Sequence, residues 1–216
     1  MTPQDEYTVP LSSDNAAVLF IDNQPSLMSE VRSIDPALLC ANTEALARLA
    51  SIYGLPVVLT VTGGGEHEPP GPLIPSITDA FPDAPVIERR DYLNAMADPR
   101  FSNAVRATRR KKLILSGVST DFCLVYPTAS LIDEGYHVLV AVDASGSWTS
   151  AINDAALQRM IQMGATPTSV RSVAGELQSA AAVRNIASSK RTQPALSEWL
   201  ARYVPAPAPI DAASHP

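Results

Sequence analysis

The chain has 216 residues, of which 46% are hydrophobic, and a formal net charge of -6 at pH 7. This length and apolar content predict one globular domain with a sizeable core. The acidic balance argues against a nucleic-acid partner, for which a basic face is expected. Two cysteines, Cys40 and Cys123, are too few for a disulfide framework, so we expect a reduced, cytoplasmic protein.

The two ends of the chain carry few targeting or structural signals. Residues 1–14 lack the basic and apolar regions of a signal peptide. No apolar run is long enough to cross a bilayer, so no membrane partner is expected. The Pro/Ala-rich stretch 204–216 is typical of a flexible tail, which leaves 1–203 as the single predicted domain.

Short apolar runs alternate with longer segments of helical spacing. The expected strands are 16–21, 56–61, 85–88, 112–115, 138–142 and 165–170, and the expected helices are 36–53, 98–108, 121–134 and 150–163, with more helix after the last strand. Continuous apolar strands separated by helices indicate βαβ units, a parallel sheet and helices on both faces. We therefore expect a three-layer α/β/α fold with a mainly parallel, doubly wound sheet of about six strands.

Ionisable side chains follow several of these strands. Asp22 comes after the first, Arg89 and Arg90 after the third, and Cys123 after the fourth, while Trp148 follows the fifth. Ligands of such a sheet bind outside the carboxyl ends of its strands. These side chains are therefore predicted to gather at one edge of the sheet.

The segment that leads to Cys123 is the most informative stretch of the chain. An apolar strand ends in Ser116 and Gly117, and the cysteine lies in the first turn of the next predicted helix. A helix N-terminus favours a thiolate, and its free N–H groups can hold an oxyanion. A free cysteine after a strand is also often a small buried hydrophobe, so the residue type alone leaves both interpretations open. Pro127 should bend this helix or leave its first turn irregular.

A cysteine nucleophile needs a proton acceptor. None of the three histidines of the chain is well placed, so Asp22 is the candidate base. Burial at the end of a strand would raise its pKa and make it a better base, although Asp22 can also serve only to cap the turn. Arg89 is the candidate cation beside the thiol, and Arg90 and a plain surface arginine stay open as alternatives.

No metal or cofactor is expected. His67 stands beside Glu66 and Glu68, a cluster more typical of a solvated loop than of a zinc or iron site. The glycines at 63–65 lack the lysine of a phosphate-binding loop and the spacing of a dinucleotide-binding fingerprint.

Three segments, in order, resemble the isochorismatase-like cysteine hydrolases, in particular their YcaC-type branch. They are AVLFIDNQ at 17–24, LILSGVSTDFC at 113–123 and GYHVLVAVDASG at 135–146. Shorter matches at 81–85, 93–95 and 175–177 extend the resemblance to about residue 202.

The resemblance implies a catalytic triad of Asp22, Arg89 and Cys123, with arginine where most of the wider family has lysine. It also implies a cis peptide bond between Val118 and Ser119. The backbone N–H groups of Ser119 and Cys123 would then form an oxyanion hole. The metal-binding histidines of the nicotinamidase relatives are missing here, in keeping with the absence of an expected metal.

The resemblance further implies a cysteine-dependent hydrolase that cleaves a small amide-type C–N substrate through a thioester. We expect Gln24 and Trp148 to line the substrate pocket, and the chain to form a homo-oligomer, a tetramer or an octamer. The alternative is a catalytically weak oligomeric protein that binds small molecules or responds to redox change, because arginine removes a titratable group from the triad. Isochorismate-type vinyl ether hydrolysis would make the cysteine dispensable, which the complete triad argues against.

Overall fold

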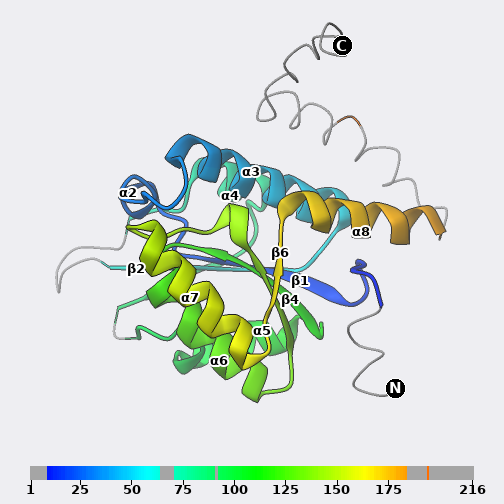
Figure 1. Ribbon diagram of the computed structural model, residues 1–216. Coiled ribbons are helices and arrows are strands. Elements are labelled where there is room, and N and C mark those ends of the chain that lie inside the picture. Colours follow the sequence, from blue (N-terminus) through cyan, green and yellow to red (C-terminus); the bar gives the residue numbers. More distant parts are fainter. Residues whose placement is uncertain (1–8, 64–70, 91, 184–193, 195–216) are drawn as a thin grey trace, which may run out of the picture.

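A six-stranded sheet forms the centre of the molecule (Figure 1). The computed structural model describes residues 9–63, 71–90, 92–183 and 194. The strands are β1 (Ala16–Ile21), β2 (Val57–Thr62), β3 (Val86–Arg89), β4 (Lys112–Gly117), β5 (His137–Ala141) and β6 (Thr166–Thr168). All pairs are parallel, in the order β3-β2-β1-β4-β5-β6. The chain order reverses between β1 and β4, so the sheet is doubly wound and the predicted fold class is confirmed.

Helices cover both faces of the sheet (Figure 1). On one face lie α3 (Pro36–Tyr53), α4 (Pro75–Ala80) and α8 (Val170–Val183), and on the other lie α5 (Pro99–Ala107), α6 (Val125–Asp133) and α7 (Ser150–Met163). The short helices are α2 (Pro25–Met28), the 3-10 helices η1 (Ala95–Ala97) and η3 (Val142–Ala144), and the π-helix η2 (Thr120–Leu124). The result is the three-layer arrangement expected for parallel strands joined by right-handed crossovers.

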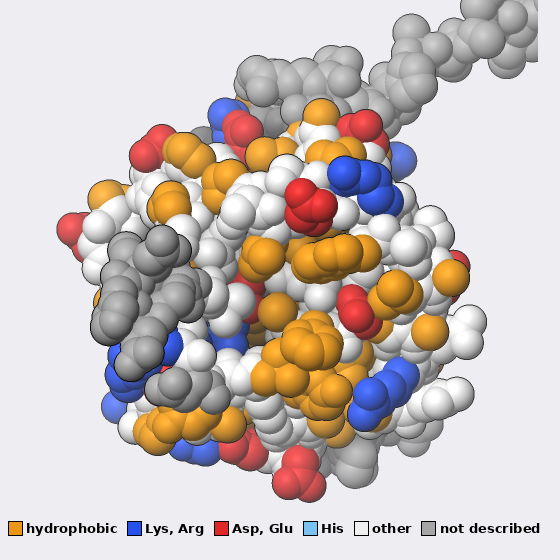
Figure 2. Space-filling model, turned by 90° about the vertical axis from the view of Figure 1, so that its left-hand side faces the viewer, with side chains coloured by type: hydrophobic (Ala, Val, Ile, Leu, Met, Phe, Trp, Pro, Cys, Tyr) orange, Lys and Arg blue, Asp and Glu red, His pale blue; other side chains and the backbone are white. Residues whose placement is uncertain are grey.

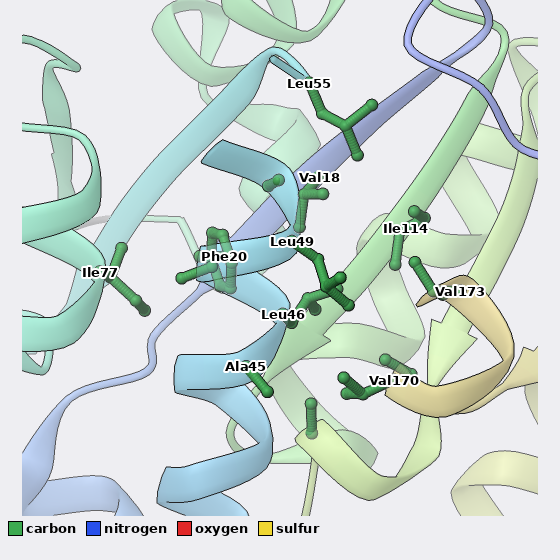
Figure 3. Packing of buried hydrophobic residues seen from close by; sticks show 14 of the residues in the cluster. Val18, Phe20, Ala45, Leu46, Leu49, Leu55, Ile77, Ile114, Val170 and Val173 are labelled. Carbon is green, nitrogen blue, oxygen red and sulfur yellow. The ribbon is translucent and has the colours of Figure 1, made fainter. Parts of the chain in front are cut away.

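Strand β1 is buried along its whole length because it faces a core on each side. Val18 and Phe20 belong to the cluster under α3 and α8, whereas Leu19 and Ile21 belong to the cluster on the opposite face. Figure 3 shows the first of these clusters, in which the labelled residues are Val18, Phe20, Ala45, Leu46, Leu49, Leu55, Ile77, Ile114, Val170 and Val173. Burying one such side chain contributes about 1.5–3 kcal/mol, so this central strand anchors both layers.

Local signals explain why α3 has the predicted bounds. Pro36 occupies the first helical position, and the Asp35 carboxylate accepts the Leu38 N–H at 3.0 Å. Gly54 ends the helix with a φ of 65°, a left-handed conformation that favours glycine. The predicted bounds of α7 are confirmed too.

Several predicted elements differ from the structure by one or two residues at their ends, and two of the differences have a visible cause. The helix expected at 121–134 consists of η2 followed by α6, so the irregular first turn expected from Pro127 is present. The strand expected at 165–170 ends at Thr168 instead. Val170 begins α8, because its N–H donates to both carboxylate oxygens of Asp143 at 2.9 and 3.2 Å.

Some sequence-based expectations fall outside the described residues. They are His67 with its neighbouring glutamates and the tail at 204–216. Among the described residues, no helix combines the length and the apolar character that crossing a bilayer requires. A cytoplasmic location stays a prediction.

Gly117, at the end of β4, is a specific test of the packing between the sheet and the cysteine segment. A Cβ added there would overlap the carbonyl oxygen of Ile21 and lie 2.9 Å from Cδ2 of Leu124. We expect Gly117→Ala to lower the free energy of unfolding by about 1–3 kcal/mol, because backbone and core must both shift. Gly175→Ala is the matched control: Gly175 lies in α8, and an added Cβ meets nothing within 4 Å. The free energy of unfolding of this control, measured by urea unfolding, should equal that of the wild type or be slightly higher.

Candidate active site

Asp22 lies directly after the central strand β1 and is wholly buried. Its φ is 60°, a left-handed conformation that is uncommon for residues other than glycine and that aspartate tolerates better than most. Its N–H donates to the carbonyl of Thr60 at 3.0 Å, which continues the pairing of β1 with β2. A backbone outlier held by the sheet in this way is typical of a functional position.

Arg89 pairs with this carboxylate. It is the last residue of β3 and is 1% exposed, and its Nη2 lies 2.6 Å from Oδ1 and 2.5 Å from Oδ2 of Asp22. Arg90 is exposed. The structure thus brings Arg89, and not Arg90, to the aspartate, as the residue-by-residue resemblance implies.

Every N–H of the Arg89 guanidinium is used within the protein. Nε donates to Oγ1 of Thr60 at 2.8 Å, and Nη1 donates to the carbonyls of Tyr92 and Leu93 at 2.7 and 3.2 Å. Nη2 supplies the two contacts to Asp22. A guanidinium has five N–H donors, so none is left for a substrate. Within the cluster, Arg89 therefore contacts Asp22 and keeps no N–H for a further partner.

Cys123 is the third member of the cluster. It lies in η2, is buried, and lies close enough to the Asp22 carboxylate for each group to shift the pKa of the other. The pKa of the thiol is raised, first by burial and then by the charge and the hydrogen bond of Asp22, while Arg89 acts in the opposite direction. The expectation that the helix terminus yields a thiolate is therefore wrong for this state. Desolvation and a neighbouring carboxylate outweigh the helix terminus, so the resting form is a thiol.

Asp22 has the electrostatics of a base. Burial raises its pKa, and the Arg89 charge together with the hydrogen bonds from Arg89 and Cys123 lower it again. Its pKa remains above the ordinary value, which strengthens the carboxylate as a proton acceptor. The pair can therefore move one proton from sulfur to oxygen when an electrophile arrives.

The backbone before Cys123 has the cis peptide bond that the resemblance implies, but one of the two expected oxyanion-hole donors is already hydrogen-bonded. The peptide bond between Val118 and Ser119 is cis. The Ser119 carbonyl accepts the N–H groups of Phe122, Cys123 and Leu124 at 3.3, 2.8 and 3.3 Å. The Cys123 N–H is thus engaged, whereas the Ser119 N–H has no acceptor within the described ranges. A two-donor oxyanion hole stays a prediction.

Of the two residues expected to line the pocket, the Gln24 side chain is hydrogen-bonded within the protein, whereas the Trp148 side chain is exposed. The Gln24 side chain is nearly buried: Nε2 donates to the carbonyls of Thr62 and Gly71 at 3.0 Å each, and Oε1 accepts the Thr62 N–H at 3.0 Å. Gln24 therefore fastens the segment after β2 to the end of the sheet. Trp148 follows η3 and is 40% exposed, so it is free to meet a ligand. Contact of either with a substrate stays a prediction.

Apolar side chains are exposed on the side of the molecule where segments follow the strands. The left-hand side of Figure 1 carries segments that follow the strands, such as α2 and the start of α7, and Figure 2 views this side. Hydrophobic groups border a hollow there, with acidic and basic groups deep within it (Figure 2). Exposed apolar residues that follow β3, β4 and β5 are Tyr92, Leu93, Phe122, Trp148 and Ile152. Exposed apolar side chains of this kind are typical of a surface that contacts a ligand or another protein.

Sequence reasoning missed the Thr60 hydroxyl and the carbonyls of Tyr92 and Leu93. A threonine in the middle of an otherwise apolar buried strand is the one available signal for the first, and the sequence holds none for the others. Within the described part of the chain, no group of three or more His, Cys, Asp or Glu side chains is placed to hold a metal ion.

The fold and the site together define the class of protein. Residues 16–172 match the isochorismatase domain family, and the chain belongs to this family. It is 41% identical over 169 residues to the "Probable hydrolase YcaC" of Escherichia coli (strain K12), which covers 78% of this chain and 80% of that protein. The resemblance stated from the sequence is therefore confirmed.

Solved structures agree with this assignment. The YcaC gene product of Escherichia coli, described as an octameric hydrolase of unknown specificity, has a TM-score of 0.79 at 38% identity over 91% of this chain and 92% of its own. YcaC from Pseudomonas aeruginosa, with hexane-2,5-diol and covalent acrylamide, has a TM-score of 0.80 at 38% identity over 90% of this chain and 96% of its own. The MAR1 ribonuclease of Caenorhabditis elegans, at 20% identity and a TM-score of 0.76 over 87% of this chain and 92% of its own, shares the fold.

Removing the cation tests the electrostatic account. We expect Arg89→Met to lower the free energy of unfolding by about 3–5 kcal/mol at neutral pH, because it leaves Asp22 as an unpaired buried charge. Without the arginine, the pKa of Asp22 in the folded state rises further above its unfolded value. Stability is then lost as pH rises between these two values, so the defect should shrink in mildly acidic buffer.

Arg90→Met is the matched control, since Arg90 is exposed one residue away. It should change stability by less than about 0.5 kcal/mol at either pH. Urea unfolding at both pH values measures both variants, and equal defects at positions 89 and 90 would contradict the assignment.

Proposed function

We propose that the protein is a cysteine-dependent hydrolase that cleaves a small amide-type C–N bond through a thioester. The observation that carries the proposal is the buried cluster in which Cys123 lies beside an Asp22 carboxylate that is paired with Arg89. The hydrolase names of the YcaC relatives support it. The covalent acrylamide in one of them supports a reactive nucleophile in that relative, because acrylamide alkylates thiols through its C=C bond.

The first half-reaction forms the thioester. As Sγ of Cys123 attacks the carbonyl carbon, its proton passes to Asp22, and the Ser119 N–H donates to the oxyanion. The proton then moves from Asp22 to the leaving nitrogen. The C–N bond breaks, the amine departs and the acyl group remains on sulfur.

The second half-reaction releases the acid. Water attacks the thioester carbonyl carbon, and Asp22 accepts a proton from it. The C–S bond breaks, and the proton returns from Asp22 to sulfur. The thiol is regenerated and the substrate has gained one water. Throughout, Arg89 holds the carboxylate in place and favours its ionised form.

The redox-responsive alternative fits the site less well. Thiols that sense oxidants are accessible and have low pKa values. Cys123 is 7% exposed, and the pKa of its thiol is raised. Of the two cysteines, only Cys40 is exposed, and it lies on α3, outside the cluster formed by Asp22, Arg89 and Cys123.

Cysteine and aspartate variants test the proposed reaction. A panel of small amides, ureas and hydrazides should yield one that the protein hydrolyses, and Cys123→Ala and Asp22→Asn should each lower turnover by about a thousandfold or more. Activity should also fall as pH drops through the raised pKa of Asp22. Cys40→Ser is the control and should retain full activity. Full turnover by Cys123→Ala would contradict the proposal.

We also propose that the chain forms a homo-oligomer, and specifically an octamer. The octameric state of the Escherichia coli relative and the exposed apolar residues that follow β3, β4 and β5 support this assembly. Light scattering coupled to size exclusion should give the mass of eight chains at micromolar concentration. A monomer mass over the whole concentration range would contradict it.

A further inference from the structure

The Thr60 hydroxyl has a fixed direction. Thr60 lies in β2 and is wholly buried, between the strands that carry Asp22 and Arg89. Its Oγ1 lies 2.7 Å from the carbonyl oxygen of Ile87 and 2.8 Å from Nε of Arg89. A carbonyl can only accept and a guanidinium can only donate, so the hydroxyl proton points to Ile87 and a lone pair faces Nε.

This contact decides how Arg89 holds the aspartate. An arginine commonly pairs with a carboxylate through two nitrogens in a fork. Here Nε is taken by Thr60, and Nη1 is taken by the Tyr92 and Leu93 carbonyls. Asp22 therefore meets a single nitrogen, Nη2. The carboxylate keeps acceptor capacity for another donor, and the Cys123 thiol is the neighbouring group that can supply one.

We propose that Thr60 is a positioning residue for the cysteine chemistry, an inference that rests on the proposed function. It acts through Arg89: by accepting Nε–H, it prevents the guanidinium from forming a fork on Asp22. The carboxylate thus stays basic enough, and open enough, to take the thiol proton.

Thr60→Val isolates this role. Valine keeps the branched shape, and the backbone bond from the Asp22 N–H to the residue 60 carbonyl does not depend on the side chain. The variant removes the acceptor for Nε, so the guanidinium can turn its Nε–H toward Asp22. We expect the carboxylate to become a weaker base and to release the thiol. Thr60→Ser retains the hydroxyl and should behave like the wild type.

The measurement is the rate at which acrylamide alkylates Cys123 across a pH series, resolved by peptide mass spectrometry. Near neutral pH, Thr60→Val should slow the reaction about tenfold, which is part of a general-base contribution. The deficit should shrink at alkaline pH, where hydroxide deprotonates the thiol. Cys40 in the same sample is the reference and should react equally in all variants. Loss of packing alone would instead change the rate at every pH.

A double-mutant cycle tests the route through Arg89. Lysine has no counterpart of Nε–H, so Thr60→Val should have no further effect in an Arg89→Lys background. Thr60→Ala also lacks the hydroxyl and gives the same comparison if the valine variant does not fold. The proposal is overturned if Thr60→Val matches the wild type near neutral pH, if Thr60→Ser is equally slow, or if the effect persists with lysine.

The outcome separates this inference from the proposed function. If Asp22→Asn leaves the neutral-pH alkylation rate of Cys123 unchanged, the aspartate is not the base, and the proposed function fails together with the inference. If Asp22→Asn slows alkylation and Thr60→Val does not, only the role of Thr60 fails.

Discussion

The buried pairing of Asp22 with Arg89 is the constraint on which the site depends. A carboxylate in this core is tolerated because a cation meets it at 2.5–2.6 Å. The strand order makes the pairing possible: β3 lies two positions from β1, so the long arginine side chain reaches across β2 to the aspartate. The charge balance of the sheet edge is thus set by topology and by one side chain of the right length.

The same pairing explains why Cys123, the nucleophile of the proposed reaction, is held as a thiol. Burial and the carboxylate both disfavour a second negative charge, and the arginine is already neutralised by Asp22. A free thiolate would be exposed to any electrophile that enters. In the proposed reaction, the thiol loses its proton to Asp22 only when a carbonyl carbon takes the developing charge, so reactivity is coupled to substrate binding.

Much of this architecture could be predicted from the sequence. The apolar runs predicted β1, and the capping residues predicted α3. The rule that functional residues follow the carboxyl ends of parallel strands predicted that Asp22, Arg89 and Cys123 gather at one edge of the sheet. The contact between Thr60 and Arg89, the engaged N–H of Cys123 and the direction of the thiol pKa could not be predicted. Each depends on which groups meet across strands in space, and local propensity carries no information on such contacts. The π-helical turn was visible only as a conflict around Pro127.

The contacts of Arg89 with the carbonyls of Tyr92 and Leu93 also bear on which substitutions this position can tolerate in evolution. One guanidinium donates hydrogen bonds to the Asp22 carboxylate, to the backbone carbonyls that follow β3 and to the Thr60 hydroxyl. A lysine in its place would serve at most three of these acceptors and would abandon the rest in a buried setting. An evolutionary change from arginine to lysine at this position should therefore be accompanied by changes at Thr60 in β2 and in the segment that follows β3. Relatives with arginine and relatives with lysine should differ in the shape of that segment.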